Sequence, residues 1–126
     1  MNIKYALAMG AGFALGAAVV QGLHAQARPP AYYIAEITVN DQEAYIKEFA
    51  ARGLKPIQEE GAKFLVRGGK PISIQGAPPA PRVTVIQFDS MDKAQAWWNS
   101  PANKDIQAIG QRYATFRSYL VEGISP

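Results

Sequence analysis

Residues 82–89 have the sequence Arg-Val-Thr-Val-Ile-Gln-Phe-Asp (RVTVIQFD), and this stretch decides which fold the chain can adopt. β-Branched and aromatic residues dominate it, so we expect a strand. Val83 and Val85 lie on one face of that strand, and Ile86 and Phe88 lie on the other. A strand with one face in water alternates apolar and polar residues, so this pattern predicts that both faces are covered.

Residues 32–39 (YYIAEITV) have the same character and predict a second strand of this kind. Tyr33 and Ile37 share one face, and Tyr32 and Ile34 share the other. Two helices can cover only one face of a sheet built from such strands. The same sheet from a second copy is the simplest cover for the other face, so we expect a two-fold homodimer.

A helix is expected to follow the first strand, because apolar residues at a spacing of three and four come after the capping residue Asp41. The stripe runs from Tyr45 to Ile57. Gly53 and Pro56 are expected to break this helix into a main part and a short second turn.

A hairpin is expected next. Residues 63–67 and residues 72–75 predict two short strands, with Gly68 and Gly69 as a tight turn between them. Residues 76–81 form a loop rich in proline.

A second helix is expected to begin at Ser90 and to stop near Asn99, where Ser100 and Pro101 restart it as cap and first helical residue. Residues 118–122 predict the last strand. The order βαββαβ, with a small extra hairpin strand, predicts an α+β ferredoxin-like fold whose antiparallel sheet carries two helices on one face.

The first 27 residues have the pattern of a secretory signal peptide. Lys4 provides a short positive region, residues 5–20 are uncharged and apolar, and Ala25-Gln26-Ala27 is a small-x-small cleavage site. The alternative is an uncleaved anchor, but the apolar run of 16 residues is shorter than the roughly 20 that span a bilayer. We expect one exported domain, residues 28–126, periplasmic or secreted and without a stable membrane anchor.

The composition limits the chemistry of that domain. The chain of 126 residues has no cysteine and a single histidine, His24, which falls in the expected signal peptide. Disulfides, Cys/His zinc sites and catalytic triads with histidine are therefore excluded for residues 28–126. No acidic cluster has metal-ligand spacing, so we expect neither a metal nor a cofactor. A formal net charge of +3, without a basic stripe, argues against nucleic-acid binding.

Four short motifs occur in order along the chain: FLVRGG (64–69), VIQFDSM (85–91), AWWNSP (96–101) and LVEG (120–123). Together they resemble the domain of unknown function 1330 family, within the dimeric α/β-barrel superfamily. The resemblance covers about residues 32–123. It implies the ferredoxin-like fold and the dimer, and it implies no activity.

The wider superfamily includes cofactor-independent oxygenases, lactone isomerases and haem enzymes. The haem branch does not suit a domain without histidine. The sequence also departs from the family at Ala102-Asn103, where an acid followed by an aromatic residue is usual after Ser-Pro. An aromatic ligand contact at that point is not expected here.

Five residues are candidates for contacting a small molecule. Arg67, at a strand end, could anchor a carboxylate, or it could be a solvated turn residue or one half of an ion pair. Trp97 and Trp98 point about 100° apart on a helix, so we expect Trp98 to face the core and Trp97 to line a pocket mouth or cover the helix break. Tyr33 and Tyr113 could donate hydrogen bonds into a cavity, although packing would also explain them.

Glu36 is a weak candidate for catalysis. It lies in the middle of the first strand, and a carboxylate in partly apolar surroundings has a raised pKa that suits a general acid or base. The alternative is an ion pair across the sheet or at the dimer interface, for which Arg82 is a candidate partner.

Three functions remain open from the sequence. The first is a homodimer that binds a small apolar or weakly anionic molecule between sheet and helices. The second is a cofactor-independent enzyme of the oxygenase or isomerase kind, with Glu36 or a tyrosine as proton carrier. The third is a structural or interaction module without a ligand. A cavity flanked by Arg67 and Glu36 would favour the first two, and a fully packed interior would favour the third.

Overall fold

A four-stranded antiparallel sheet in the order β2-β3-β1-β4 organises the part of the chain that the computed structural model describes, residues 28–126. The expected signal peptide, with Ala27 and His24, lies outside the described residues. The strands are β1 (Ala31–Val39), β2 (Lys63–Gly69), β3 (Arg82–Phe88) and β4 (Ala114–Glu122). β4 begins four residues earlier than expected, because it pairs with the whole length of β1.

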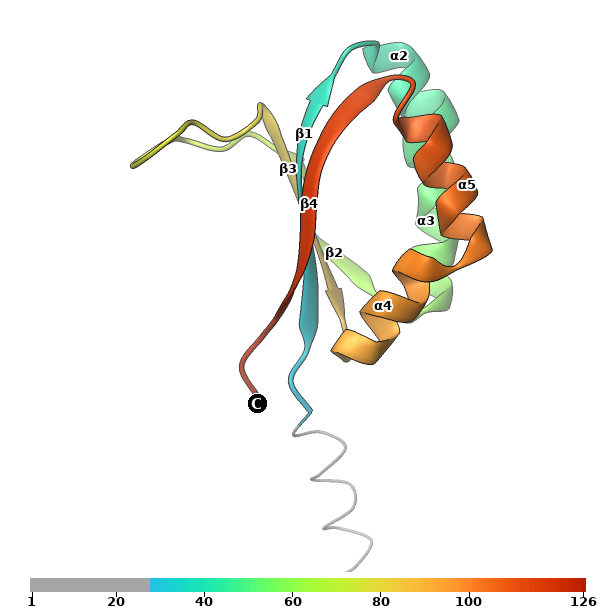
Figure 1. Cartoon of the computed structure of the whole chain (residues 1–126), viewed down its shortest axis with the longest axis vertical. Helices are drawn as coiled ribbons and strands as arrows, with labels where there is room; N and C mark the ends of the chain where they lie inside the picture. The colour runs from blue at the N-terminus through green and yellow to red at the C-terminus, as the bar shows by residue number, and fades with distance from the viewer. Residues whose placement is uncertain (1–27) are drawn as a thin grey trace, which may run out of the picture. The chain divides into compact units, whose positions relative to one another are not determined.

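The helices lie together on one face of this sheet (Figure 1). They are α2 (Gln42–Ala44), η1 (Tyr45–Ala50), α3 (Ala51–Glu59), α4 (Met91–Asn99) and α5 (Pro101–Gly110). The ferredoxin-like α+β prediction is therefore confirmed. None of these described helices is long and apolar enough to cross a membrane.

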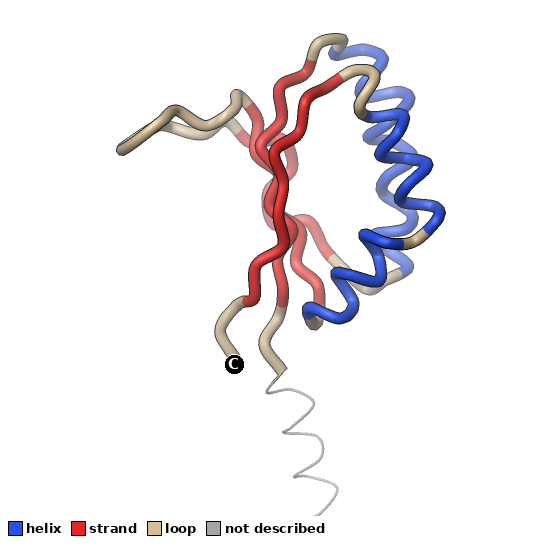
Figure 2. Tube along the Cα trace, viewed as in Figure 1, coloured by secondary structure: helices blue, strands red, loops and turns tan. Residues whose placement is uncertain are grey.

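The core lies between the helices and the sheet face that they cover. Tyr33 and Ile37 of β1 are less than a tenth exposed, as are Ile86 and Phe88 of β3. The alternation in the sequence groups Tyr33 with Ile37, and Ile86 with Phe88, and the structure places both pairs on the face that the helices cover. We call the other face of the sheet the open face, because no described helix lies over it (Figure 2).

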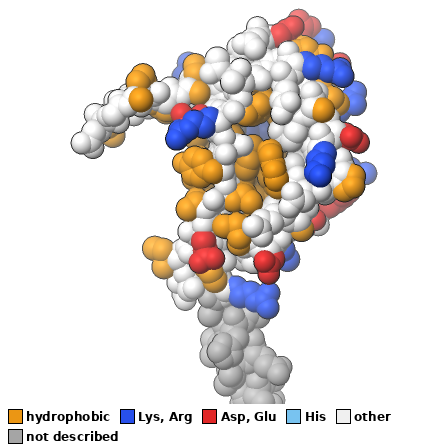
Figure 3. Space-filling view, viewed as in Figure 1, with side chains coloured by type: hydrophobic (Ala, Val, Ile, Leu, Met, Phe, Trp, Pro, Cys, Tyr) orange, Lys and Arg blue, Asp and Glu red, His pale blue; other side chains and the backbone are white. Residues whose placement is uncertain are grey.

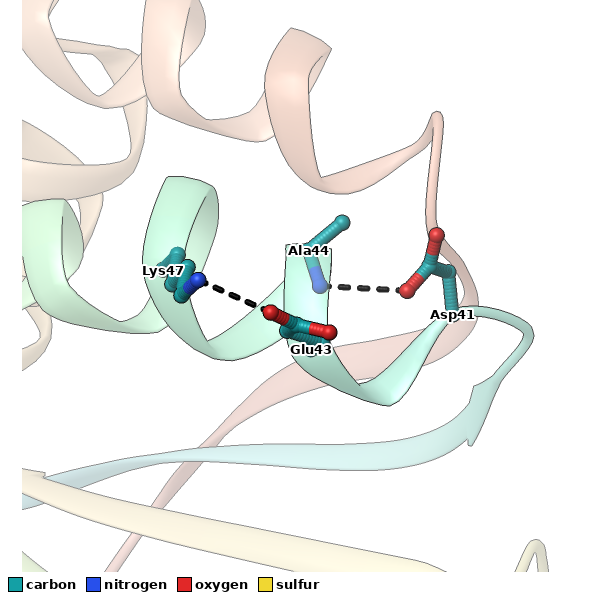
Figure 4. Close-up of polar contacts among 4 residues, drawn as sticks. All are labelled: Asp41, Glu43, Ala44 and Lys47. Carbon is teal, nitrogen blue, oxygen red and sulfur yellow. Dashed lines mark hydrogen bonds and ion pairs between the residues drawn. The ribbon is translucent and has the colours of Figure 1, made fainter.

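The first helical region is continuous from α2 through η1 to α3, so the expected break at Gly53 and Pro56 is wrong. Asp41 caps its start, as expected: the carboxylate accepts a hydrogen bond of 3.1 Å from the backbone N–H of Ala44 (Figure 4). Pro56 lies inside α3, and the next residue, Ile57, is buried. Burial of the apolar stripe outweighs the local preference of glycine and proline to end a helix.

The expected hairpin is also wrong. Gly68 and Gly69 continue β2 instead of forming a turn, and the N–H of Gly68 donates to the Thr84 hydroxyl at 3.0 Å on neighbouring β3. Residues 72–75 form no strand, and all of residues 70–81 form a loop. Four prolines in this loop lack the N–H that a sheet ladder needs. We call residues 70–81 the arm.

The two tryptophans exchange the orientations expected from the sequence. Trp97 is buried at 3 % exposure, whereas Trp98 is 37 % exposed. The Trp97 ring lies 5.1 Å from that of Phe88 and 5.0 Å from that of Tyr33. The helix restart was predicted correctly, because the Ser100 hydroxyl accepts a hydrogen bond from the N–H of Asn103 at 3.2 Å.

Candidate functional site

A partly enclosed pocket lies between the sheet and the helices. About 70 Å³ of it is open to the centres of water molecules, which is room for several waters or part of a small ligand. Most of its wall is apolar, and the wall residues come from all four strands and from η1, α3, α4 and α5. Wall residues include Ile37, Phe49, Ile57, Ile86, Ile106 and Phe116.

Several polar side chains in the wall already have partners. The Asn103 amide donates to the Trp98 carbonyl at 3.0 Å and accepts from the Gln107 amide at 3.3 Å. The Thr84 hydroxyl accepts from the N–H of Gly68. Arg67, Tyr45 and the carbonyl of Gln107 keep hydrogen-bonding capacity in this wall.

Arg67 enters the pocket from the end of β2. Its guanidinium lies 4.7 Å from the centre of the Phe64 ring, and one nitrogen donates to the Ala50 carbonyl at a long 3.4 Å. No ion pair among the described residues includes Arg67, and no acidic residue lines the pocket. A guanidinium has five N–H donors, so Arg67 can still bind an anionic group.

Tyr45 lines the same pocket and lies near enough to Arg82 and Arg67 to be affected by their charges. The Arg82 guanidinium is 5.5 Å from the centre of the Tyr45 ring. Burial raises the pKa of the Tyr45 hydroxyl, and the charges of Arg82 and, less strongly, Arg67 oppose that rise. Tyr45 therefore stays protonated near neutral pH and can donate a hydrogen bond.

Nothing in the sequence pattern distinguished Tyr45 from the other apolar positions of the helical stripe. Its place in the site depends on η1, a π-helical turn that contributes Tyr45, Phe49 and Ala50 to the pocket wall. Such turns insert an extra residue into a helix and often occur at functional sites. The one available signal was a tyrosine at a position where an aliphatic residue would fill a core.

Tyr33 lines the pocket from β1, next to Trp97. Burial raises the pKa of the Tyr33 hydroxyl above its usual value of 10.0, and hydrogen bonding to Ser118 only partly offsets this. The phenolate form is therefore less stable in the folded protein than in the unfolded chain.

This shift predicts a loss of stability in alkali. The contribution of Tyr33 is fully present below its unfolded pKa of 10.0 and is lost as the pH rises through the higher folded pKa. The urea midpoint of the protein should fall, as the pH rises above about 10, more steeply than that of Tyr33→Phe. Equal slopes in the two proteins would contradict the assignment.

The structure brings together three of the six candidates from the sequence, because Arg67, Tyr33 and Trp97 all line the pocket. Trp98 does not line it; its ring stacks on that of Tyr33 at 5.8 Å and is partly exposed. Tyr113 packs against the core without lining the pocket, and its carbonyl accepts hydrogen bonds from the backbone at the start of the first helix.

Glu36 lies on the open face of the sheet, so the pocket is flanked by Arg67 but not by Glu36. One carboxylate oxygen pairs with Arg117, and the other accepts a hydrogen bond from the N–H of Ala80 at 3.1 Å. The expected pair with Arg82 is wrong because of the strand register. Glu36 lies opposite Arg117 on β4, whereas Arg82 lies opposite Ile37, whose side chain faces the helices.

The described residues contain no group of three His, Cys, Asp or Glu side chains that could hold a metal ion. They also contain no histidine or cysteine at all. The pocket therefore offers tyrosine hydroxyls, amides and a guanidinium, which suit the recognition of an anion.

Known structures share this fold at low sequence identity. A protein of unknown function from Rhodopseudomonas palustris is 14 % identical, with 86 % of this chain and 93 % of that chain covered and a TM-score of 0.62. The methylated form of that protein is 13 % identical, with 86 % of this chain and 91 % of that chain covered and a TM-score of 0.63.

A conserved protein of unknown function from Bacteroides thetaiotaomicron, described as a possible oxidoreductase, is 14 % identical to this chain. The comparison covers 76 % of this chain and 98 % of that chain, with a TM-score of 0.50. At such identities the likeness shows the fold alone. Among curated proteins, no sequence matches this chain. The model of the family Domain of unknown function (DUF1330) matches residues 30–124, so the chain belongs to that family.

Proposed function

We propose that this domain, exported and dimeric, binds a small apolar molecule that carries an anionic group. The observation that carries the proposal is Arg67, whose guanidinium borders an apolar pocket without an acidic partner among the described residues. The apolar body of the ligand would lie against Phe49, Ile86 and Phe116, and its anionic end would lie at Arg67.

The two ends of the pocket favour such a ligand for different physical reasons. Burial of apolar ligand surface contributes about 25 cal/mol per Å². A hydrogen bond to a charged group contributes about 1.5–3 kcal/mol more, and the Tyr45 hydroxyl can add a second donor. A neutral apolar molecule would use only the first contribution.

Replacing Arg67 tests this proposal with a matched pair of probes, hydrocinnamate and hydrocinnamyl alcohol. Binding can be followed by tryptophan fluorescence, because Trp97 lines the pocket. Arg67→Gln should weaken hydrocinnamate binding about 10-fold to 100-fold, the equivalent of about 1.5–3 kcal/mol, and should leave the alcohol unchanged.

Arg52→Gln is the matched control, because Arg52 is exposed on α3 and pairs with Glu48 instead of lining the pocket. This variant should bind both probes like the original protein. An equal loss of acid and alcohol in Arg67→Gln would contradict the role of Arg67 as an anion anchor. No preference for the acid in the original protein would contradict the proposed ligand class.

A cofactor-independent oxygenase or isomerase is the second candidate function. The position of Tyr45 beside two arginines favours it, because positive charge opposes the effect of burial on a tyrosine that must give up a proton. Turnover of a bound substrate should be lost in Tyr45→Phe and kept in Glu36→Gln, because Glu36 lies on the other face of the sheet. The open volume in the pocket weighs against a module without any ligand.

Export and dimerisation can be tested together by native mass spectrometry of protein purified from its own compartment. The N-terminal pattern supports export, and the apolar open face supports the dimer. The expected species is a dimer of chains that begin at Arg28, with a small molecule retained. A chain of full mass would contradict cleavage, a monomer would contradict the dimer, and a clean dimer without ligand would weaken the binding proposal.

A further inference from the structure

The arm, residues 70–81, leaves the sheet between β2 and β3 and projects away from the helices (Figure 1). It carries two of the most exposed large apolar side chains in the described chain, Ile72 at 87 % and Ile74 at 94 %. Residues two apart in an extended segment point to the same side. The arm therefore presents an isoleucine pair to solvent with no described residue covering it.

The arm is held in its direction rather than left as a free loop. Pro71, Pro78, Pro79 and Pro81 restrict its backbone near both ends. At its base, the N–H of Ala80 donates to Glu36, whose carboxylate is also paired with Arg117. A segment that is already ordered loses little conformational entropy when it docks.

The open face offers an apolar surface on the same side. Strand register places Ile34, Val85 and Tyr119 in a row across it, and Val121 follows on β4. Tyr119 is 47 % exposed and Val121 is 40 % exposed. Figure 3 shows hydrophobic side chains on the arm as well as along the sheet. Among the charges on this face, Glu36 and Arg117 neutralise each other, and Lys63, which lies opposite Gln87 on the edge strand β2, adds one positive charge. The centre of the face is therefore compatible with a second copy of itself.

The area of the face shows why the arm matters. Four strands about 4.8 Å apart, each with about seven residues of 3.3 Å, give a face of roughly 440 Å². A typical stable interface buries about 800 Å² of accessible surface on each partner, so contacts made by the arm would enlarge the interface that the sheet provides. About half of the twelve residues of the arm lead away from the sheet and half return to it, so the tip can lie about 20 Å from the sheet. That distance is enough to add contact area on a partner.

We propose that each arm packs against a second copy of this chain, with Ile72 and Ile74 in contact with the open face of that copy. This inference rests on the proposed dimer and adds to it the exchange of arms. In the proposed two-fold dimer, each copy gives its arm to the other, so the two contacts are equivalent and the assembly closes at two copies. Glu36 then acts as a positioning residue that fixes the direction of the arm.

Cysteine cross-linking tests the exchange, because the chain contains no native cysteine. The Ile74→Cys protein carries a mass tag, and a second, untagged protein carries Leu65→Cys, Tyr119→Cys or Val121→Cys. The two proteins are unfolded together, refolded so that mixed dimers form, and then oxidised mildly. Leu65 is included because it is 50 % exposed on β2, near the other edge of the sheet. At least one mixture should give a tagged–untagged disulfide dimer. Gln95→Cys, on the outer side of α4, is the control and should give none.

The possible results distinguish the proposed arm exchange from the proposed dimer. A monomer in light scattering would overturn both proposals. A dimer without any tagged–untagged product would overturn the arm exchange alone. An internal disulfide in the double variant Ile74→Cys/Tyr119→Cys, formed without cross-linked dimers, would show that the arm folds onto its own sheet and would also overturn the exchange.

A second measurement does not depend on disulfide geometry. Ile72→Asp/Ile74→Asp should raise the dissociation constant of the dimer at least about tenfold and leave hydrocinnamate binding unchanged, because the pocket lies on the other face. Glu36→Ala should weaken the dimer, and Glu36→Gln, which keeps an acceptor for Ala80, should weaken it less. An unchanged dissociation constant in the double aspartate variant would contradict the proposal.

Discussion

Replacing Trp97 with alanine is expected to destabilise the domain by about 3–5 kcal/mol, the range for removing a large aromatic side chain from a core. Trp97 is 3 % exposed, and its ring contacts those of Phe88 and Tyr33. Its loss would open a cavity that continues into the pocket. Urea unfolding followed by far-ultraviolet circular dichroism measures the change.

Trp98→Ala is the matched control, because Trp98 is the next residue on the same helix. It is 37 % exposed, and its ring lies 5.8 Å from that of Tyr33 and 5.7 Å from that of Trp97. The expected loss is about 1–2 kcal/mol, the scale of one or two aromatic pairs. Trp97→Phe keeps a ring in the core and should fall between the two. A greater loss in Trp98→Ala than in Trp97→Ala would contradict the observed orientation of the helix.

The alternation of side chains was enough to predict the central strands. β1 and β3 pair with each other, and their apolar residues on the helix side fill the core, so pattern and packing agree. Residues 72–75 show why the same signal fails elsewhere. Ile72 and Ile74 alternate as in a strand, but a strand also needs a neighbour with free N–H and C=O groups, and the flanking prolines hinder such a ladder.

The candidate site was harder to predict because it depends on how each helix is rotated about its axis and on which face of a strand each side chain lies. A rotation of about 100° decides whether Trp97 or Trp98 faces the core, and the sequence alone does not fix that rotation. A shift of one residue decides which face Glu36 occupies. The sequence pattern already assigned Tyr33 and Ile37 to the face opposite Ile34, so the outward position of Glu36 follows from the same alternation.

The chemistry of the pocket favours binding over base catalysis. Burial raises the pKa of both Tyr33 and Tyr45, so both hydroxyls are donors near neutral pH. Arg67 adds further donors, and no carboxylate lines the wall. A site rich in donors and poor in negative charge attracts anions, whereas a general base would need an acceptor that is available at neutral pH.

Replacing Tyr119 with aspartate is expected to convert the proposed dimer into monomers, with a dissociation constant raised at least about 100-fold. Two-fold symmetry would place one aspartate from each copy in the interface, and an unpaired buried charge costs several kcal/mol. Tyr119 is 47 % exposed on the edge strand β4, so the separate chain should still fold. Light scattering at micromolar concentration measures the mass, and circular dichroism checks the fold.

Ile46→Asp provides the matched control, because Ile46 is 49 % exposed on the helical side of the molecule. The two variants carry the same new charge at similar exposure but on opposite sides of the sheet. If the open face is the interface, only Tyr119→Asp dissociates. Dissociation of Ile46→Asp alone would place the interface on the helices, and it would leave the open face and the arm without a partner copy.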